Sequence, residues 1–170
     1  MDPHVALALA AGAIAVQRVA ELRLARRNER WARSRGAVEH GAAHYPAFFV
    51  LHTGWLAGWL LEAGLRGAAV AAAWPVWLSL LAAAEALRYW AIATLGQRWN
   101  TRVLVLPGEP PVRRGPYRYL RHPNYLAVAV ELAAVPLLFD AWITALTASL
   151  LNAALLVGVR IPAEERALRP

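Results

Sequence analysis

Five apolar segments divide this chain, and they constrain its fold more than any other feature of the sequence. They span Val5–Leu24, Pro46–Leu65, Ala68–Tyr89, Tyr125–Phe139 and Ala141–Val159. A helix needs about 20 mostly apolar residues to cross the hydrocarbon core of a bilayer. Hydrophobic residues make up 59% of the chain, above the roughly 45–50% of soluble domains. The sequence therefore predicts an all-α integral membrane protein with about five transmembrane helices.

The fourth segment is short, and only Asp140 separates it from the fifth. We expect these two segments to form a tight helical hairpin, which need not cross the whole bilayer independently. The 170 residues are the length of a single domain, so we expect one membrane-embedded domain over residues 1–170. Cysteine is absent, which excludes disulfides and thiolate chemistry.

The positions of the arginines predict an orientation. All eighteen basic residues are arginines, and they cluster after the first, third and fifth segments, whereas the opposite loops hold only Arg66. By the positive-inside rule the amino terminus lies outside and the carboxyl terminus in the cytoplasm of a bacterial cell. Because the arginines bracket apolar segments, the net charge of +7 favours contact with anionic headgroups over nucleic acid.

Several ionisable residues lie within the apolar segments. Arg18 and Glu21 are one turn apart, as are Glu85 and Arg88. Ions inside a membrane pair with each other or line a cavity, so these residues form ion pairs or a polar wall beneath a site. Glu131 has no basic neighbour on its own segment, and it either meets Arg18 or Arg88 or faces a cavity.

The histidines allow two interpretations. His40 and His44 have the i,i+4 spacing of a metal site, but without cysteine or a suitable carboxylate nearby they are better read as an interfacial structural pair. His52 lies on an apolar segment and is expected to be a hydrogen-bonded core residue.

Two polar motifs fall on the predicted cytoplasmic side. One reads Gly-Pro-Tyr-Arg-Tyr-Leu-Arg-His-Pro-Asn-Tyr from Gly115 to Tyr125, and the other contains Arg160 and Glu164-Glu165. Glycine and prolines make the first an ordered, non-helical connection. Aromatic and imidazole rings, backbone carbonyls and a carboxylate suit an adenosyl cofactor. No glycine-rich nucleotide motif, P-loop or nucleophile elbow is present.

These motifs, in this order, resemble the isoprenylcysteine carboxyl methyltransferase family of membrane enzymes, which use S-adenosylmethionine. Gln17 to Leu22, His44-Tyr45-Pro46 and Trp99 to Val103 are similar to a bacterial branch associated with type III polyketide synthases and the O-methylation of alkylpyrones. The resemblance covers nearly the whole chain. Relatives extend further past the acidic pair than Pro170, which implies a short branch or a more open acceptor site.

The resemblance implies that a cytoplasmic loop over residues 96–124 holds the cofactor and that Arg160 is the catalytic residue, facing an anionic oxygen of the substrate. The residues that it implies for cofactor binding are Val112, Gly115, Tyr117, His122, Pro123, Asn124, Tyr125 and Glu164.

The expected function is S-adenosylmethionine-dependent methylation of an enol, phenol or carboxylate oxygen on a lipid-like substrate from the bilayer. The resemblance to the bacterial branch implies an alkylpyrone as one such acceptor and a functional link to a type III polyketide synthase; no nucleic-acid partner is expected. Two alternatives stay open: a prenylcysteine carboxyl or phospholipid methyltransferase, and a non-catalytic lipid-binding membrane subunit.

Overall fold

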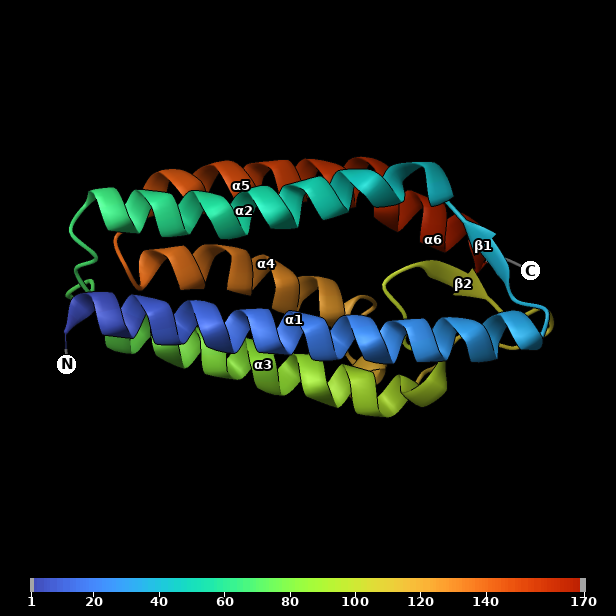
Figure 1. Cartoon of the computed structure of the whole chain (residues 1–170). Helices are drawn as coiled ribbons and strands as arrows, with labels where there is room; N and C mark the ends of the chain where they lie inside the picture. The colour runs from blue at the N-terminus through green and yellow to red at the C-terminus, as the bar shows by residue number, and fades with distance from the viewer. Residues whose placement is uncertain (1, 169–170) are drawn as a thin grey trace.

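The computed structural model describes residues 2–168, and its helices run side by side along one axis (Figure 1). The amino terminus lies at one end of this bundle, and two short strands and the last helix lie at the other, which we call the ladder end. The helices are α1 (Pro3–Ser34), α2 (Tyr45–Leu65), α3 (Trp74–Leu95), α4 (Pro123–Leu137), α5 (Trp142–Leu155) and α6 (Ile161–Ala167).

Four helical stretches are long and apolar enough to cross a membrane. They are Pro3–Ser34, Ala42–Leu65, Trp74–Arg98 and Trp142–Ala167, and the last joins α5 and α6 through the π-helical turn η4 (Leu156–Arg160). Helix α4 is apolar but shorter. The mostly helical fold with membrane-spanning helices is thus confirmed, whereas the number of about five transmembrane helices stays a prediction.

The boundaries differ most from the predicted segments at α1, which continues past Leu24 to Ser34, and at α3. This helix begins at Trp74 and not at Ala68. Gly67 and Ala68 have φ values of 81° and 55°, which do not belong to a right-handed helix. Pro75 then stands in the first turn of α3, where its fixed φ favours initiation.

Helices α4 and α5 form the predicted tight hairpin. Asp140 adopts a left-handed conformation with a φ of 54°. The backbone N–H groups of Phe139 and Ala141 both donate to the carbonyl oxygen of Pro136, at 3.0 Å. Two expectations involve residues outside the described range. The predicted orientation uses Arg169, among the arginines after the fifth segment, and the short branch or more open acceptor site rests on the chain end at Pro170.

A small antiparallel ladder is the main element that the all-α prediction omitted. Strand β1 (Val38–His40) pairs with β2 (Val103–Val105), and Glu39 is opposite Leu104. Burial disfavours the charged form of Glu39, but hydrogen bonds from Arg102 and Arg33 outweigh it and lower the pKa of this carboxyl. The ladder thereby ties the end of α1 to the connection after α3.

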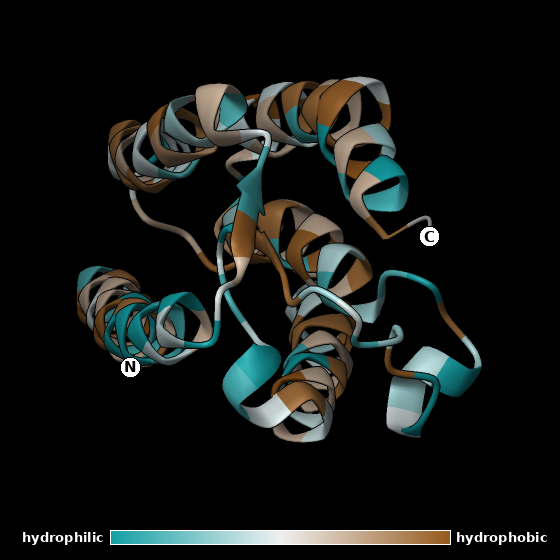
Figure 2. Cartoon of the chain, turned by 90° about the vertical axis from the view of Figure 1, so that its right-hand side faces the viewer, coloured by the Kyte–Doolittle hydropathy of each residue, from teal (hydrophilic) through white to brown (hydrophobic). Residues whose placement is uncertain are grey.

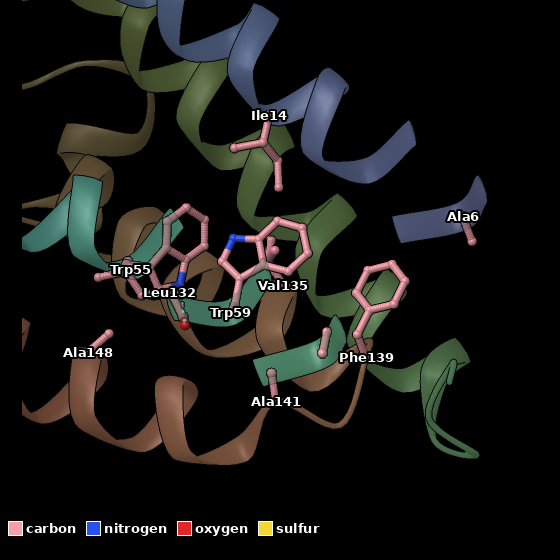
Figure 3. Close-up of a cluster of buried hydrophobic side chains, with 10 residues drawn as sticks. Ala6, Ile14, Trp55, Trp59, Leu132, Val135, Phe139, Ala141 and Ala148 are labelled. Atoms are coloured by element: carbon pink, nitrogen blue, oxygen red, sulfur yellow. Dashed lines mark hydrogen bonds between the residues drawn. The ribbon is translucent and has the colours of Figure 1, made fainter. Parts of the chain in front are cut away.

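The apolar core lies between α1, α2 and the α4–α5 hairpin (Figure 3). Trp59 stacks on Phe139, with ring centroids 5.7 Å apart. The indole N–H of Trp55 donates to the carbonyl oxygen of Leu132 at 3.0 Å. Pro136 stands four residues after Leu132 and has no N–H to complete that helical hydrogen bond, so the tryptophan supplies the missing donor.

A buried ionic cluster joins α1, α3 and α4, and it consists of Arg18, Glu21, Glu85, Arg88 and Glu131. Both arginines pair with Glu21 and with Glu131, and Gln17 donates to Glu85 at 2.6 Å. The first alternative for Glu131, contact with arginines of other helices, is confirmed. Because an unpaired ion is costly inside a membrane, this cluster fixes α1 against the bundle.

His44 and His52 both contact Phe48. Nδ1 of His52 lies 2.8 Å from the carbonyl oxygen of Phe48, so this residue is the predicted hydrogen-bonded histidine. The His44 ring packs edge-on against Phe48. Among residues 2–168, no group of three or more histidine or carboxylate side chains is placed to hold a metal ion.

Candidate functional site

A cavity of about 810 Å³ opens at the ladder end, the end that faces the viewer in Figure 2. Its walls come from β2, the connection after it, the start of α4 and the last helical stretch. Most of the sequence-predicted site residues line it, namely Val112, Tyr117, His122, Asn124, Tyr125, Arg160 and Glu164. The segments around His122 and Arg160, about 40 residues apart in the sequence, thus line the same cavity.

Gly115 and Pro123 shape this cavity without lining it. Gly115 has a φ of 55°, and a Cβ atom there would lie 2.4 Å from Oγ1 of Thr94 on α3. Only glycine combines this conformation with so close an approach. Pro123 is buried in the first turn of α4, where a missing N–H breaks no helical hydrogen bond. These two residues fix the backbone positions of His122 and Asn124.

His122 and Tyr125 form one wall as a stacked pair. Their ring centroids are 5.2 Å apart and their planes are inclined by 11°. Nε2 of His122 and Oδ1 of Asn124 are buried without a hydrogen-bond partner within residues 2–168. Buried polar atoms of folded proteins are nearly always paired, so these two atoms indicate a ligand-binding surface.

A chain of hydrogen bonds links the two polar motifs. The Tyr125 hydroxyl donates to the Glu164 carboxylate and accepts from Nε of Arg160 at 3.1 Å. Arg160 is only 5% exposed. Its Nη2 donates to the carbonyl oxygen of Thr101 at 2.8 Å, and its guanidinium lies 5.8 Å from the ring centre of Phe48. The orientation of Arg160 is therefore held from three sides.

The π-helical turn η4 ends at Arg160. Such a turn inserts a residue into an α-helix and is frequent at functional sites. Here it changes the rotation of the last helical turns, so that both Arg160 and Glu164 face the cavity.

Tyr117 and Val112 complete the wall on the side of the long connection. Burial and the Glu164 carboxylate raise the pKa of Tyr117 well above its ordinary value of 10, so its hydroxyl stays protonated. The segment around Val112 is held by Arg98, whose Nη2 donates to the carbonyl oxygen of Pro110 at 3.0 Å. The connection from α3 to α4 is therefore held together by a contact between its own residues.

Sequence reasoning missed the part of the cavity that β2 provides. Val103, Leu104, Val105 and Leu106 form an apolar wall. Their continuous apolar run with two β-branched residues was the available signal for a strand. Its partner strand contains a glutamate and a histidine, so the pairing itself had no local signature.

Comparison with known proteins assigns this chain to a family. The model of the isoprenylcysteine carboxyl methyltransferase (ICMT) family matches residues 77–170, which include both polar motifs. The chain is 39% identical over 154 residues to the uncharacterized protein YpbQ of Bacillus subtilis, covering 91% of each chain. It is 28% identical over 143 residues to an uncharacterized protein of Haemophilus influenzae, covering 84% of this chain and 83% of the other.

No solved structure matches the chain. The match to the family model covers more than half of the sequence and contains the residues that gather at the ladder end. The chain therefore belongs to the isoprenylcysteine carboxyl methyltransferase family.

Proposed function

We propose that this integral membrane protein is an S-adenosylmethionine-dependent methyltransferase that acts on an anionic oxygen of a lipid-like substrate. Family membership implies a membrane methyltransferase. The observation that carries the finer proposal is the junction of the two polar motifs, where Tyr125 bonds both Glu164 and Arg160 at the edge of one cavity. We propose an alkylpyrone enol as the first acceptor to test.

The cavity fits the cofactor by size and by chemistry. A volume of about 810 Å³ lies in the range of small-molecule sites, roughly 300–1,000 Å³. Nε2 of His122 and Oδ1 of Asn124, which have no hydrogen-bond partner within residues 2–168, are available to the polar groups of the cofactor. The apolar β2 wall suits the adenine ring, and Glu164 suits the ribose hydroxyls or the amino group.

The protein's own residues then have distinct tasks. When bound, S-adenosylmethionine supplies an electrophilic methyl group on a sulfonium. Arg160 holds the acceptor oxyanion in position, and it cannot act as a base because a guanidinium stays protonated. An enolate or carboxylate is already ionised near neutral pH, so no strong general base is required. Because the pKa of Tyr117 is raised, its phenol stays protonated. It can contact a bound ligand but does not act as a base.

We further propose that the ladder end faces the cytoplasm of a bacterial cell, with the amino terminus outside. The support is the arginine distribution, because twelve arginines lie in the second half of α1, directly after it and in the connection from α3 to α4, and the positive-inside rule retains such segments in the cytoplasm. The cofactor then enters from the cytosol and the acceptor from the bilayer. A type III polyketide synthase is the proposed source of the acceptor.

The first test measures S-adenosylmethionine binding to the detergent-purified protein by calorimetry. We expect micromolar binding that is lost in His122→Ala and Glu164→Ala and kept in Glu29→Ala, a carboxylate outside the cavity. No binding at millimolar cofactor by folded protein would contradict the proposal and favour the non-catalytic alternative.

The second test separates binding from turnover. Arg160→Ala is expected to reduce methyl transfer far more than cofactor binding, because Arg160 is assigned to the acceptor. An equal loss of both would overturn this division of roles. Labelled methyl transfer to an alkylpyrone, a prenylcysteine analogue and phosphatidylethanolamine then identifies the acceptor class.

A further inference from the structure

A second cavity, of about 320 Å³, lies between α4 and α5 beside the first one. Its α4 side is one helical face with the i, i+3, i+4, i+7 spacing, namely His122, Tyr125, Leu126 and Ala129. Helix α5 and the turn η4 contribute Ser149, Asn152, Ala153, Leu156 and Val157. Arg160 and Glu164 line the first cavity and not the second, so the proposed methyl transfer leaves this space without a ligand.

Asn152 holds a buried amide oxygen that the protein leaves unpaired. The residue is 2% exposed, and its Oδ1 has no hydrogen-bond partner in the part of the chain that the structure describes. Asparagines in membrane helices commonly bond across to a neighbouring helix, which this oxygen does not do. Burying a polar atom without a partner is costly, and bilayer hydrocarbon offers no water to compensate. The arrangement indicates a ligand that donates a hydrogen bond to Oδ1.

Ser149 lies one helical turn before Asn152, so the two side chains share a face of α5. Its Oγ is also buried without a partner among residues 2–168. An amide oxygen can only accept a hydrogen bond, whereas a serine hydroxyl can both donate and accept. A single hydroxyl group on a ligand satisfies both residues, because its O–H donates to Oδ1 of Asn152 and its oxygen accepts from Ser149. An ether oxygen could accept from Ser149 but would leave Asn152 unpaired.

The rest of the lining restricts the ligand to a neutral molecule with one apolar chain. Among the described residues, the lining contains no arginine and no carboxylate, so it offers no partner to a phosphate or an ammonium group. Leu126 is 47% exposed and Val157 is 69% exposed, which gives the cavity an apolar rim that suits an alkyl chain continuing into the bilayer. The volume lies at the lower end of small-molecule sites, roughly 300–1,000 Å³, and suits one chain better than two.

We infer that the second cavity is a binding site for a neutral single-chain lipid with a free hydroxyl group, that is, a long-chain alcohol. Asn152 and Ser149 hold the hydroxyl, and the chain leaves the cavity past Leu126 and Val157. The site adjoins the first cavity at the stacked pair of His122 and Tyr125, which line both. Lipid binding here requires neither the cofactor nor methyl transfer, so its tests are independent of the proposed function.

Occupancy is tested by thiol protection in phosphatidylcholine nanodiscs, whose lipid has no hydroxyl donor. Because the chain has no cysteine, Ala153→Cys places a single thiol in the cavity lining, and Leu150→Cys places one on the exposed face of α5. A membrane-permeable thiol reagent is applied with dodecanol or with dodecyl methyl ether, which has the same chain but no donor. We expect the alcohol to slow labelling at position 153 with an affinity about ten- to hundredfold above that of the ether, and labelling at position 150 to stay unchanged.

Two results would contradict the site. Equal protection by both compounds at position 153 would overturn the role of the hydroxyl donor. Unchanged labelling at position 153 would overturn lipid binding altogether, and it is the result expected if only a water molecule binds Asn152 and Ser149.

The role of the amide is tested with Asn152→Leu, which replaces the acceptor by an apolar branch. In the Ala153→Cys background this substitution should abolish the preference for the alcohol over the ether, and a preference that persists would refute the assignment to Asn152. Without ligand, Asn152→Leu should be at least as stable to heat as the wild type, because it removes an unpaired buried group. A lowered melting temperature would instead indicate a structural asparagine.

The melting temperature of protein with the native Ala153 gives a readout that does not depend on the cysteine variant. A ligand that binds the folded protein raises its stability by mass action, so the wild type should melt at a higher temperature in dodecanol than in the same concentration of the ether. Asn152→Leu should melt at the same temperature in both. Equal melting temperatures of the wild type in the two compounds would contradict the site.

Discussion

The hydrogen bond between Trp55 and Leu132 provides a quantitative test of the packing of α4. Pro136 leaves the Leu132 carbonyl without its helical donor, and the Trp55 indole N–H replaces that donor at 3.0 Å. In Trp55→Phe the ring stays aromatic but the carbonyl loses its partner. An unsatisfied buried carbonyl costs about 1–3 kcal/mol, and the loss of indole volume adds to that value.

Trp59→Phe is the matched control for the lost volume. Trp59 is fully buried next to the same helix, but its indole nitrogen has no partner among the described residues. Both substitutions shrink a buried indole to a phenyl, and only Trp55→Phe removes a hydrogen bond. The free energy of unfolding should therefore fall by about 1–3 kcal/mol more in Trp55→Phe than in Trp59→Phe.

A double-mutant cycle with Pro136→Ala isolates the interaction. Alanine at position 136 supplies a backbone N–H to Leu132, so Trp55→Phe should cost about 1–3 kcal/mol less in that background. Unfolding is followed by circular dichroism in mixed micelles during denaturing-detergent titration, since tryptophan fluorescence changes with the substitutions. A coupling energy below about 0.5 kcal/mol would refute the replacement of the missing donor by Trp55.

Three further predictions follow from single residues. Arg88→Met should destabilise the protein by about 3–5 kcal/mol because it leaves Arg18 as the one cation of the cluster beside Glu21, Glu85 and Glu131. Arg66→Met, at a more exposed ion pair, should cost at most about 1 kcal/mol, and similar losses in the same detergent titration would contradict this. Gly115→Ala should lower the melting temperature more than Gly108→Ala, since both have positive φ but only Gly115 lacks space for a Cβ atom. The lowered pKa of Glu39 means that its stabilisation is present above the ordinary carboxyl pKa of 4.5 and is lost as the pH falls through the lowered value. Hydrogen exchange of the β1–β2 ladder should therefore accelerate in acid, and Glu39→Gln should remove this dependence; an unchanged pH profile in the variant would argue against it.

Much of the fold follows from the sequence alone. Each apolar segment, each cluster of arginines and the turn at Asp140 reports a local transfer free energy or a local backbone preference. These properties do not depend on what lies beside the segment, so the membrane helices and the α4–α5 hairpin were predictable. The start of α3 was misplaced because Ala68 is apolar yet adopts a turn conformation, which hydropathy does not report.

The candidate site was predictable in part. The two polar motifs were identified by their order and residue types, and the structure brings Tyr125, Arg160 and Glu164 into contact. The sequence did not indicate that Gly115 and Pro123 lie behind the cavity wall, or that β2 supplies an apolar side. The last helical turns face the cavity through the π-helical turn at η4, which has no reliable sequence signal.

Only the tertiary structure decided how residues on different helices meet. Asn152 reads in the sequence as one polar residue within an apolar segment. Only the packing of α4 against α5 reveals that its Oδ1 is buried without a hydrogen-bond partner among residues 2–168. Likewise, Glu131 joins Arg18 and Arg88 because the rotations of three helices bring them together. The sequence determines which segments enter the membrane through the local cost of leaving water. The contacts between those segments depend on helix rotation and register, which are set by packing over the whole bundle.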